Sequence, residues 1–135
     1  MAVYCIATPQ ITINTVDLSE YLKDVSLTYE ADELETTASG DTSKEFIAGL
    51  KSWKVDATVN QDYTASKVDA TLFPLVGAAP FAIILRPTSA AKGANNPEFT
   101  GNCILTSYPP MSGAVGEVAT VKFTMRGTGA LARGV

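Results

Sequence analysis

The sequence contains no histidine, the residue that serves most often as general base and metal ligand near neutral pH. It also lacks a glycine-rich stretch followed by Lys-Ser or Lys-Thr, the pattern that cradles phosphate groups. The two cysteines, Cys5 and Cys103, do not have the spacing of a zinc site. We therefore expect a protein that is not an enzyme and that carries no cofactor and no metal.

Carboxylates leave two kinds of chemistry open. Paired carboxylates suffice for glycoside hydrolysis. The cluster of Asp32, Glu33 and Glu35 offers oxygen ligands for a hard cation such as Ca²⁺. This cluster does not follow the Asp-x-Asp-x-Asp-Gly pattern of calcium-binding loops, so specific metal binding is the less favoured interpretation.

Long apolar runs and a cysteine framework are also missing. No run approaches the roughly 20 residues that a membrane-spanning helix needs. The start of the chain does not show the basic segment and apolar run of a signal peptide. Two cysteines are too few for a disulfide scaffold. We expect free, buried thiols at Cys5 and Cys103, synthesis in the cytoplasm, and no membrane partner.

Basic residues are few and scattered. Ten Lys and Arg stand against fourteen Asp and Glu, which gives a net charge of −4. Tight nucleic-acid binding needs a basic patch and is therefore not expected. The acidity is concentrated in residues 30–45, where six carboxylates and one lysine give −5. The simplest interpretation of such a run is a solvated loop.

Alternation of apolar and polar residues is the main pattern that the sequence does contain. It predicts strands with one buried and one exposed face, because successive side chains of a strand point to opposite sides. The alternating segments are residues 10–14, 25–30, 53–60 and 121–126. Residues 81–85 are continuously apolar and predict a strand buried on both faces. Residues 99–108 form another candidate strand.

Residues 64–76 break this rhythm, because their apolar residues fall near helical spacing. We predict one short helix of about three turns there. Thr64 is a candidate N-cap, because its hydroxyl can accept a hydrogen bond from an unpaired backbone N–H. Pro74 should distort the last turn, and Gly77 should end the helix.

Residues 31–46 form a long polar stretch with Ser39-Gly40-Asp41 at its predicted tip. Loops longer than about 12–15 residues are usually functional or disordered, and we expect this one to be mobile. Many short strands with a single helix predict a mainly β fold. The expected architecture is a β-sandwich or barrel of antiparallel strands with one flanking short α-helix, in a single domain spanning residues 1–135.

Residues 44–53, Lys-Glu-Phe-Ile-Ala-Gly-Leu-Lys-Ser-Trp, resemble a pattern in the major tail proteins, or tail tube proteins, of long-tailed bacteriophages. In that family an acidic mobile loop ends in an apolar residue, followed by Gly-Leu and an aromatic residue that opens an alternating strand. The similarity continues in Phe99-Thr100-Gly101, in Tyr108 before a turn, in Gly116-Glu117-Val118, and in Gly127 and Gly129. It covers nearly the whole chain.

The resemblance implies a structural virion protein with a β-sandwich fold and a flanking helix. Its subunits would form hexameric rings that stack into the tail tube through which DNA passes. The tube proteins of contractile tails and of type VI secretion are similar in fold. The implied partners are further copies of the chain, other phage tail proteins, and DNA in transient, non-specific passage. The implied location is the virion, after synthesis in the host bacterial cytoplasm. An acidic chain without a basic stripe fits a tube in which DNA must slide.

The resemblance also implies roles for particular residues. The predicted ring-stacking residues lie in the acidic loop and are Leu34, Glu35, Asp41, Lys44 and Phe46. The predicted lumen-facing residues are the polar members of two alternating segments, namely Ser26, Thr28, Glu30, Ser52, Lys54, Asp56 and Thr58. The simpler alternative for the second set is an ordinary solvent face. Phe46 either contacts a neighbouring ring or caps its own core. Alternation places Trp53 in the core.

Two other classes of function stay open. A capsid decoration or head–tail joining protein of a phage would also be a β-rich assembly unit. A carbohydrate-binding module or small hydrolase would need a cleft lined with aromatic residues or paired carboxylates. Aromatic residues make up only 8% of the chain, which counts against a carbohydrate-binding module or small hydrolase.

Overall fold

The computed structural model describes residues 3–135, and this part of the chain forms seven antiparallel strands in one sheet. The strands are β1 (Gln10–Ile13), β2 (Val16–Asp17), β3 (Leu22–Glu35), β4 (Phe46–Asn60), β5 (Phe81–Arg86), β6 (Glu98–Leu105) and β7 (Thr120–Gly134). Their spatial order is β2-β1-β5-β6-β7-β4-β3. The predicted mainly β fold of antiparallel strands with one short α-helix is confirmed for these residues.

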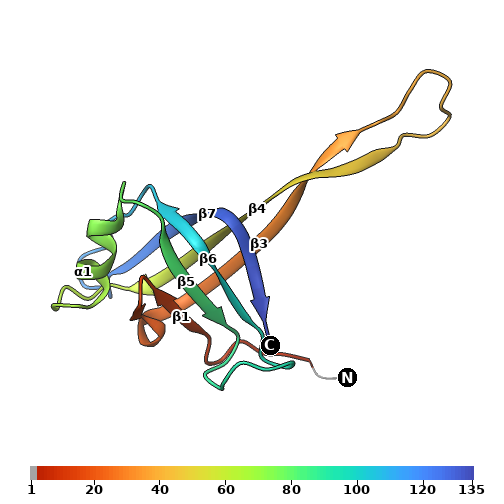
Figure 1. Cartoon of the computed structure of the whole chain (residues 1–135). Coiled ribbons are helices and arrows are strands. Elements are labelled where there is room, and N and C mark those ends of the chain that lie inside the picture. Colours follow the sequence, from red (N-terminus) through yellow and green to blue (C-terminus); the bar gives the residue numbers. More distant parts are fainter. Residues whose placement is uncertain (1–2) are drawn as a thin grey trace.

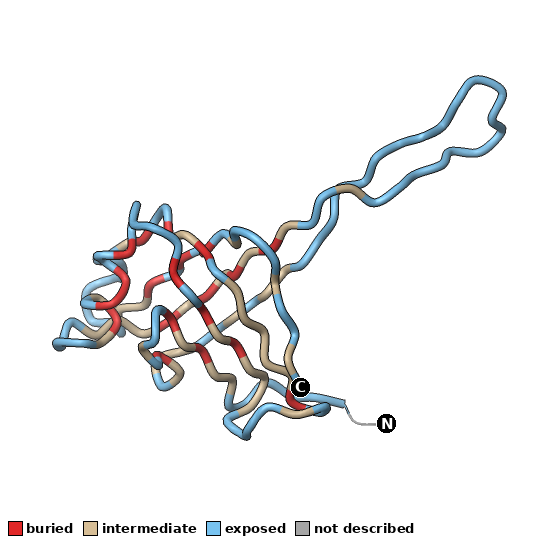
Figure 2. The backbone as a smooth tube through the Cα atoms, viewed as in Figure 1, coloured by how far each residue is buried: buried red, intermediate tan, exposed pale blue. Residues whose placement is uncertain are grey.

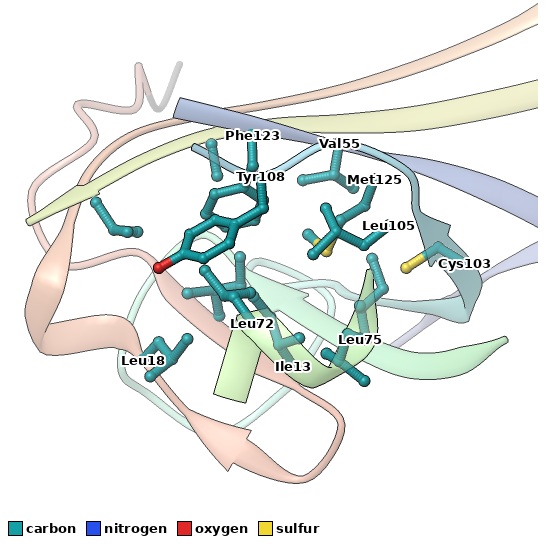
Figure 3. Packing of buried hydrophobic residues seen from close by; sticks show 14 of the residues in the cluster. Ile13, Leu18, Val55, Leu72, Leu75, Cys103, Leu105, Tyr108, Phe123 and Met125 are labelled. Atoms are coloured by element: carbon teal, nitrogen blue, oxygen red, sulfur yellow. The ribbon is translucent and has the colours of Figure 1, made fainter. Parts of the chain in front are cut away.

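The sheet is curled, so that strands far apart in its order share one apolar core (Figure 1). In Figure 3, Ile13 of β1, Val55 of β4 and Leu72 of the helix point into the same cluster. Val25 and Leu27 of the edge strand β3 are half-buried and pack against this apolar core. Figure 2 shows that the buried residues lie in this body, whereas the part of the β3–β4 hairpin that projects from the body is exposed.

The alternation that predicted β4 and β7 is realised in the structure. In β4, the buried residues are Trp53, Val55, Ala57 and Val59, and the residues between them are not buried. In β7, Val121, Phe123 and Met125 are buried in the same alternating way. The prediction for residues 81–85 was wrong. Only Phe81, Ile83 and Leu85 are buried, whereas Ala82 is exposed and Ile84 is half-buried. An antiparallel sheet with its core on one side leaves the other face of each strand to solvent, whatever its residues.

The helix is shorter than the predicted 64–76. The α-helix α1 covers Val68–Leu72 and continues as a 3₁₀ turn, η2, over Phe73–Leu75. Pro74 sits in the first positions of that turn, where its missing N–H costs no hydrogen bond. Gly77, with φ of +73°, ends the segment as expected. No described helix is long and apolar enough to cross a membrane.

Thr64 does not cap the helix, because α1 begins after Lys67 and has no side-chain cap. Asp62 organises this turn instead. Its Oδ1 accepts the Thr64 N–H at 2.8 Å, and its backbone carbonyl accepts the Asp69 N–H at 3.1 Å. A short carboxylate thus replaces the predicted hydroxyl, as in an Asx turn.

Asp62 also ties this turn to a second 3₁₀ turn, η1 (Ser19–Tyr21), which precedes β3. The Tyr21 hydroxyl donates to Asp62 Oδ2 at 2.6 Å. This hydrogen bond, with two more from Thr64, lowers the pKa of Asp62 to about 2. The same contact raises the pKa of Tyr21 well above its usual value.

The two cysteines are not joined by a disulfide, which confirms that they are free. Cys103 is fully buried, and burial raises the pKa of its thiol to about 12. Cys5 is exposed, so the prediction that both thiols are buried was wrong for this residue. It precedes β1 in a segment that does not enter the core, although the local residues are apolar.

Candidate functional site

The β3–β4 hairpin leaves the body as a two-stranded arm, defined here as residues 30–52 (Figure 1). β4 pairs with β7 only from Lys54 onward. Nearer the hairpin tip, its partner in the described chain is β3 alone. Every arm residue is exposed apart from Gly49 and Ser52, which are half-buried. A two-stranded ribbon of this kind is marginally stable without further contacts.

The unpaired tip of the arm is shorter than the predicted loop of residues 31–46. Residues 31–35 and Phe46 belong to strands, and the connection is residues 36–45. Within the tip, the Ala38 N–H donates to Asp41 Oδ2 at 2.7 Å, and the Glu45 N–H donates to Thr37 Oγ1 at 2.8 Å. The polar composition of the tip therefore supplies hydrogen bonds that fold it locally. The carboxylate of Asp41, predicted to contact a neighbouring ring, is engaged in the tip itself.

The Gly-Leu pair of the arm is a β-bulge. Between the pairs Ala31–Lys51 and Glu33–Ala48 the register shifts, so that Gly49 and Leu50 together lie opposite one residue, Asp32. A side chain at Gly49 would place its Cβ 3.0 Å from the Asp32 Cβ. Glycine therefore allows the two strands to approach at the bulge, and the bulge adds twist to the arm.

Apolar side chains lie on both faces of the arm. Leu34 pairs with Ile47, and Glu35 pairs with Phe46, so that each pair shares one face. Leu34, Phe46 and Ile47 are about half exposed, at 49%, 47% and 55%, and Leu50 is 82% exposed. Phe46 is not part of the apolar core, so it does not cap the core of its own subunit. Lys44 is exposed in the tip.

The seven residues predicted to face a lumen lie on one side of the sheet. Cross-strand pairing joins Ser26 to Asp56, Thr28 to Lys54, Glu30 to Ser52, and Asp24 to Thr58. Since paired residues share a face, all of these side chains lie on the face opposite Trp53 and Val55. The structure therefore brings the predicted set together as one polar surface, here called the polar face.

Sequence reasoning predicted the strand at residues 121–126 but did not assign its polar residues to this face. Lys54 pairs with Arg126, Asp56 with Thr124, and Thr58 with Lys122. The Thr124 hydroxyl donates to Asp56 Oδ1, and the Lys54 ammonium lies 3.9 Å from the other oxygen of Asp56. The signal that could have found these residues is the alternation of residues 121–126. What the sequence did not contain is the neighbour relation between β4 and β7, which are about sixty residues apart along the chain.

The carboxylates of the acidic segment do not gather at one place. Among residues 3–135, no three His, Cys, Asp or Glu side chains converge on a point that could hold a metal ion. Glu33 and Asp32 are neighbours on a strand, so their side chains point to opposite faces of the arm. The acidic residues are therefore spread along a ribbon rather than gathered into a ligand cage.

No protein-family model matches the chain, and no curated protein sequence matches it. Solved structures do match. A chain in the virion of a native gene transfer agent particle superposes with a TM-score of 0.76 at 13% identity, over 95% of this chain and 96% of that chain. A chain in the tail of an empty gene transfer agent particle, refined helically with C6 symmetry, superposes with a TM-score of 0.65 at 15% identity, over 83% and 81%. The chain thus shares its fold, over nearly its whole length, with a component of the gene transfer agent virion.

Proposed function

We propose that this protein is a tail tube subunit, a structural virion component that forms rings of six which stack into a tube for DNA passage. The likeness in fold to a chain of a particle tail with C6 symmetry supports this assignment. The observation on this chain that carries it is the arm, which leaves the body and exposes apolar side chains on both faces. In a monomer the apolar side chains of the arm stay exposed to water and do not stabilise the fold, whereas in an assembly they are buried against another subunit.

Contacts with further copies also account for the free edge of the sheet. β3 is an edge strand, and its outer side has no partner strand within residues 3–135. Long exposed edges pair readily with other chains unless they are blocked or covered. A head-to-tail ring covers the edge of each subunit with its neighbour and closes on itself. The arm then remains free to reach the next ring in a stack.

The polar face suits the wall of a channel for DNA. Its charged residues are three carboxylates, Asp24, Glu30 and Asp56, and three cations, Lys54, Lys122 and Arg126. Its remaining members are Ser and Thr hydroxyls. Such a balanced surface attracts the phosphate backbone weakly, because strong binding requires an excess of cations. Weak attraction is what allows DNA to slide.

The arm is proposed to stack the rings. Its tip residues contact nothing in the body, and its apolar residues need a surface that the monomer does not provide. Deleting residues 36–43 removes the tip but leaves Glu35 and Phe46, the last paired residues. We expect this variant to keep the melting temperature of the wild type, since loop length affects folding stability only weakly. We expect it to lose stacking.

Electron microscopy and sedimentation over a concentration series test the proposal with both proteins. The wild type should be a monomer when dilute and form stacked rings or tubes when concentrated. The deleted variant should stop at single rings. A wild type that stays monomeric at every concentration would overturn the proposal. Single rings that never stack, in the wild type as well, would favour a head–tail joining protein instead.

A further inference from the structure

Residues 3–9, here called the strap, lie at the end of the body where the C-terminus and the loop after β5 are found (Figure 1). The strap forms no helix or strand, and residues 3–8 are all exposed (Figure 2). Within residues 3–135 it makes no backbone-to-backbone hydrogen bond. In this part of the chain its one hydrogen bond runs from the Tyr4 hydroxyl to the carbonyl of Pro87. The strap therefore lies on the body without belonging to the sheet.

The strap is loosely packed. Tyr4, Ile6 and Pro9 border an apolar groove of about 170 Å³. Ala7 and Thr8 border a second hollow, of about 640 Å³, beside the start of β3. Segments with few packed neighbours and few hydrogen bonds open at a small cost in free energy. Movement of the strap would therefore disturb little of the fold.

Pro9 separates the strap from the sheet. β1 begins at Gln10, which pairs with Arg86 of β5. Proline has no N–H to donate to a strand ladder, which favours an end of β1 at this position. Residues 7 and 8 form a bend directly before it. The strap can therefore turn about residues 7–9 while β1 keeps its place.

The strap lies beside the free edge of the sheet. Tyr4 and Ile6 share the apolar groove with Val25 and Leu27 of β3. β3 is an edge strand, and these two side chains are only half-buried. Native proteins commonly cover such an edge, because its row of N–H and C=O groups pairs readily with other chains. The strap is placed where it can cover the edge of β3.

The composition of the strap suits an apolar surface. Its sequence, Val-Tyr-Cys-Ile-Ala-Thr-Pro, carries no charged side chain. Val3, Tyr4 and Ile6 are 86%, 49% and 62% exposed, so much of their apolar surface meets water in this position. Movement toward β3 would bury Tyr4 and Ile6 in the groove. Movement away would leave the groove open to a neighbouring molecule.

We propose that the strap controls access to the edge of β3 and so regulates assembly. In the free subunit the strap closes onto the groove and blocks the approach of a second copy. During assembly it turns away about residues 7–9, and the neighbouring subunit takes its place beside Val25 and Leu27. The inference rests on the proposed function, in which a neighbour covers this edge within a ring. It gives a physical reason for a monomer at low concentration.

Loosening the strap tests the proposal. Tyr4→Phe loses the hydrogen bond to Pro87 and should lower the concentration at which tubes form by roughly threefold, since one hydrogen bond contributes modestly. Tyr63→Phe is the matched control, because the Tyr63 hydroxyl also donates to a proline carbonyl, that of Pro110 in the loop after β6. It should assemble as the wild type does. Tyr4→Ser combined with Ile6→Ser removes the apolar contacts and should lower the concentration by about tenfold or more.

Light scattering measures these concentrations, and electron microscopy distinguishes tubes from amorphous aggregates. Hydrogen exchange in the dilute monomer reads the position of the strap without any assembly. Closure should protect the amides of β3 near Val25 and Leu27, so the variant with both serines should exchange them faster than the wild type. The amides of residues 120–126, which pair with β4 toward the helix end of the body, should exchange alike in both proteins.

The strap and the tail tube assignment fail in different ways. Equal assembly concentrations in the wild type and the strap variants would overturn the regulatory role and leave the assignment standing. A higher concentration in the variants would make the strap part of the contact between subunits, and would also overturn its role as a block. A wild type that does not assemble at all would overturn the assignment. Unchanged exchange of β3 in the variant with both serines would overturn the closed strap in either case.

Discussion

The indole ring of Trp53 occupies the space that a side chain at Gly127 would need. A Cβ at Gly127 would lie 2.1 Å from Cε2 of the indole and 2.2 Å from Cδ2. A Cβ at Gly101 would also lie only 2.5 Å from Cζ2. The indole Nε1 donates to the carbonyl of Gly129 at 3.2 Å. Trp53 therefore fills the fork where β4 leaves β7 to enter the arm, and it connects the root of the arm to the body.

Gly127→Ala should destabilise the fold. The added methyl group overlaps the indole, so the buried ring has to shift from its place. Overpacking of this kind typically costs about 1–3 kcal/mol in the free energy of unfolding. Urea denaturation measures it. Gly93→Ala is the matched control, because a Cβ there meets nothing within 4 Å. Equal midpoints for the two variants would mean that the indole does not need the space at Gly127.

Reversing a charge on the polar face should increase DNA binding without unfolding the protein. We expect Glu30→Lys and Asp56→Lys to retain DNA on assembled tubes at low salt, because the new cations repeat in every ring. Binding should weaken steeply as salt is raised. Glu117→Lys, in the exposed loop before β7, is the control and should behave as wild type. Fluorescence anisotropy with labelled DNA measures the effect, and genome delivery should fall in the first two variants. Unchanged DNA binding and delivery in both would remove this face from the lumen.

The Tyr21–Asp62 hydrogen bond should make stability depend on pH at the acid end. The pKa of Asp62 falls from 3.8 to about 2 in the folded state, chiefly because Tyr21 donates to its carboxylate. A lowered pKa stabilises the fold above the unfolded value, so the contribution is complete above about pH 4 and is lost as the pH falls toward 2. The raised pKa of Tyr21 has the opposite sense, and its contribution is lost as the pH rises above 10.

Tyr21→Phe tests this coupling directly. Without the hydroxyl, the pKa of Asp62 should rise toward its usual value, and the acid limb of the stability profile should flatten. Carboxyl titration by NMR and denaturation between pH 2 and pH 7 measure the two effects. Tyr29→Phe removes an exposed hydroxyl and should change neither. An Asp62 pKa that stays low in Tyr21→Phe would assign the shift to the hydrogen bonds from Thr64 instead.

The two thiols should differ in reactivity. Iodoacetamide at pH 8 should label Cys5 rapidly in the folded protein and leave Cys103 unmodified, because burial raises the pKa of Cys103 to about 12 and excludes the reagent. In denaturant both thiols should react at similar rates. Intact-mass spectrometry separates one label from two. Rapid double labelling of the folded protein would show that the core around Cys103 opens readily.

Local pattern determined much of this molecule by itself. The period of two in residues 53–60 and 121–126 assigned both strands and both of their faces, so Trp53 was correctly placed in the core and the predicted lumen residues do share one surface. Such assignments succeed because side-chain direction in a strand depends only on the parity of the position. The small number of cysteines led to the prediction that Cys5 and Cys103 are not bridged to each other, and both are free.

Only the tertiary structure decided which segments become neighbours. Because β4 pairs with β7, Lys122, Thr124 and Arg126 belong to the polar face. In β5, the position of the core decided that only one face of this apolar strand is buried. The arm reaches beyond the body because β4 parts from β7 at Trp53, and Gly127 supplies the space that makes this fork possible. These relations join residues far apart along the chain. Sequence periodicity shows which residues of one strand share a face, but it does not show which strand will lie beside it. Strand pairing is set by how the whole sheet curls around its core.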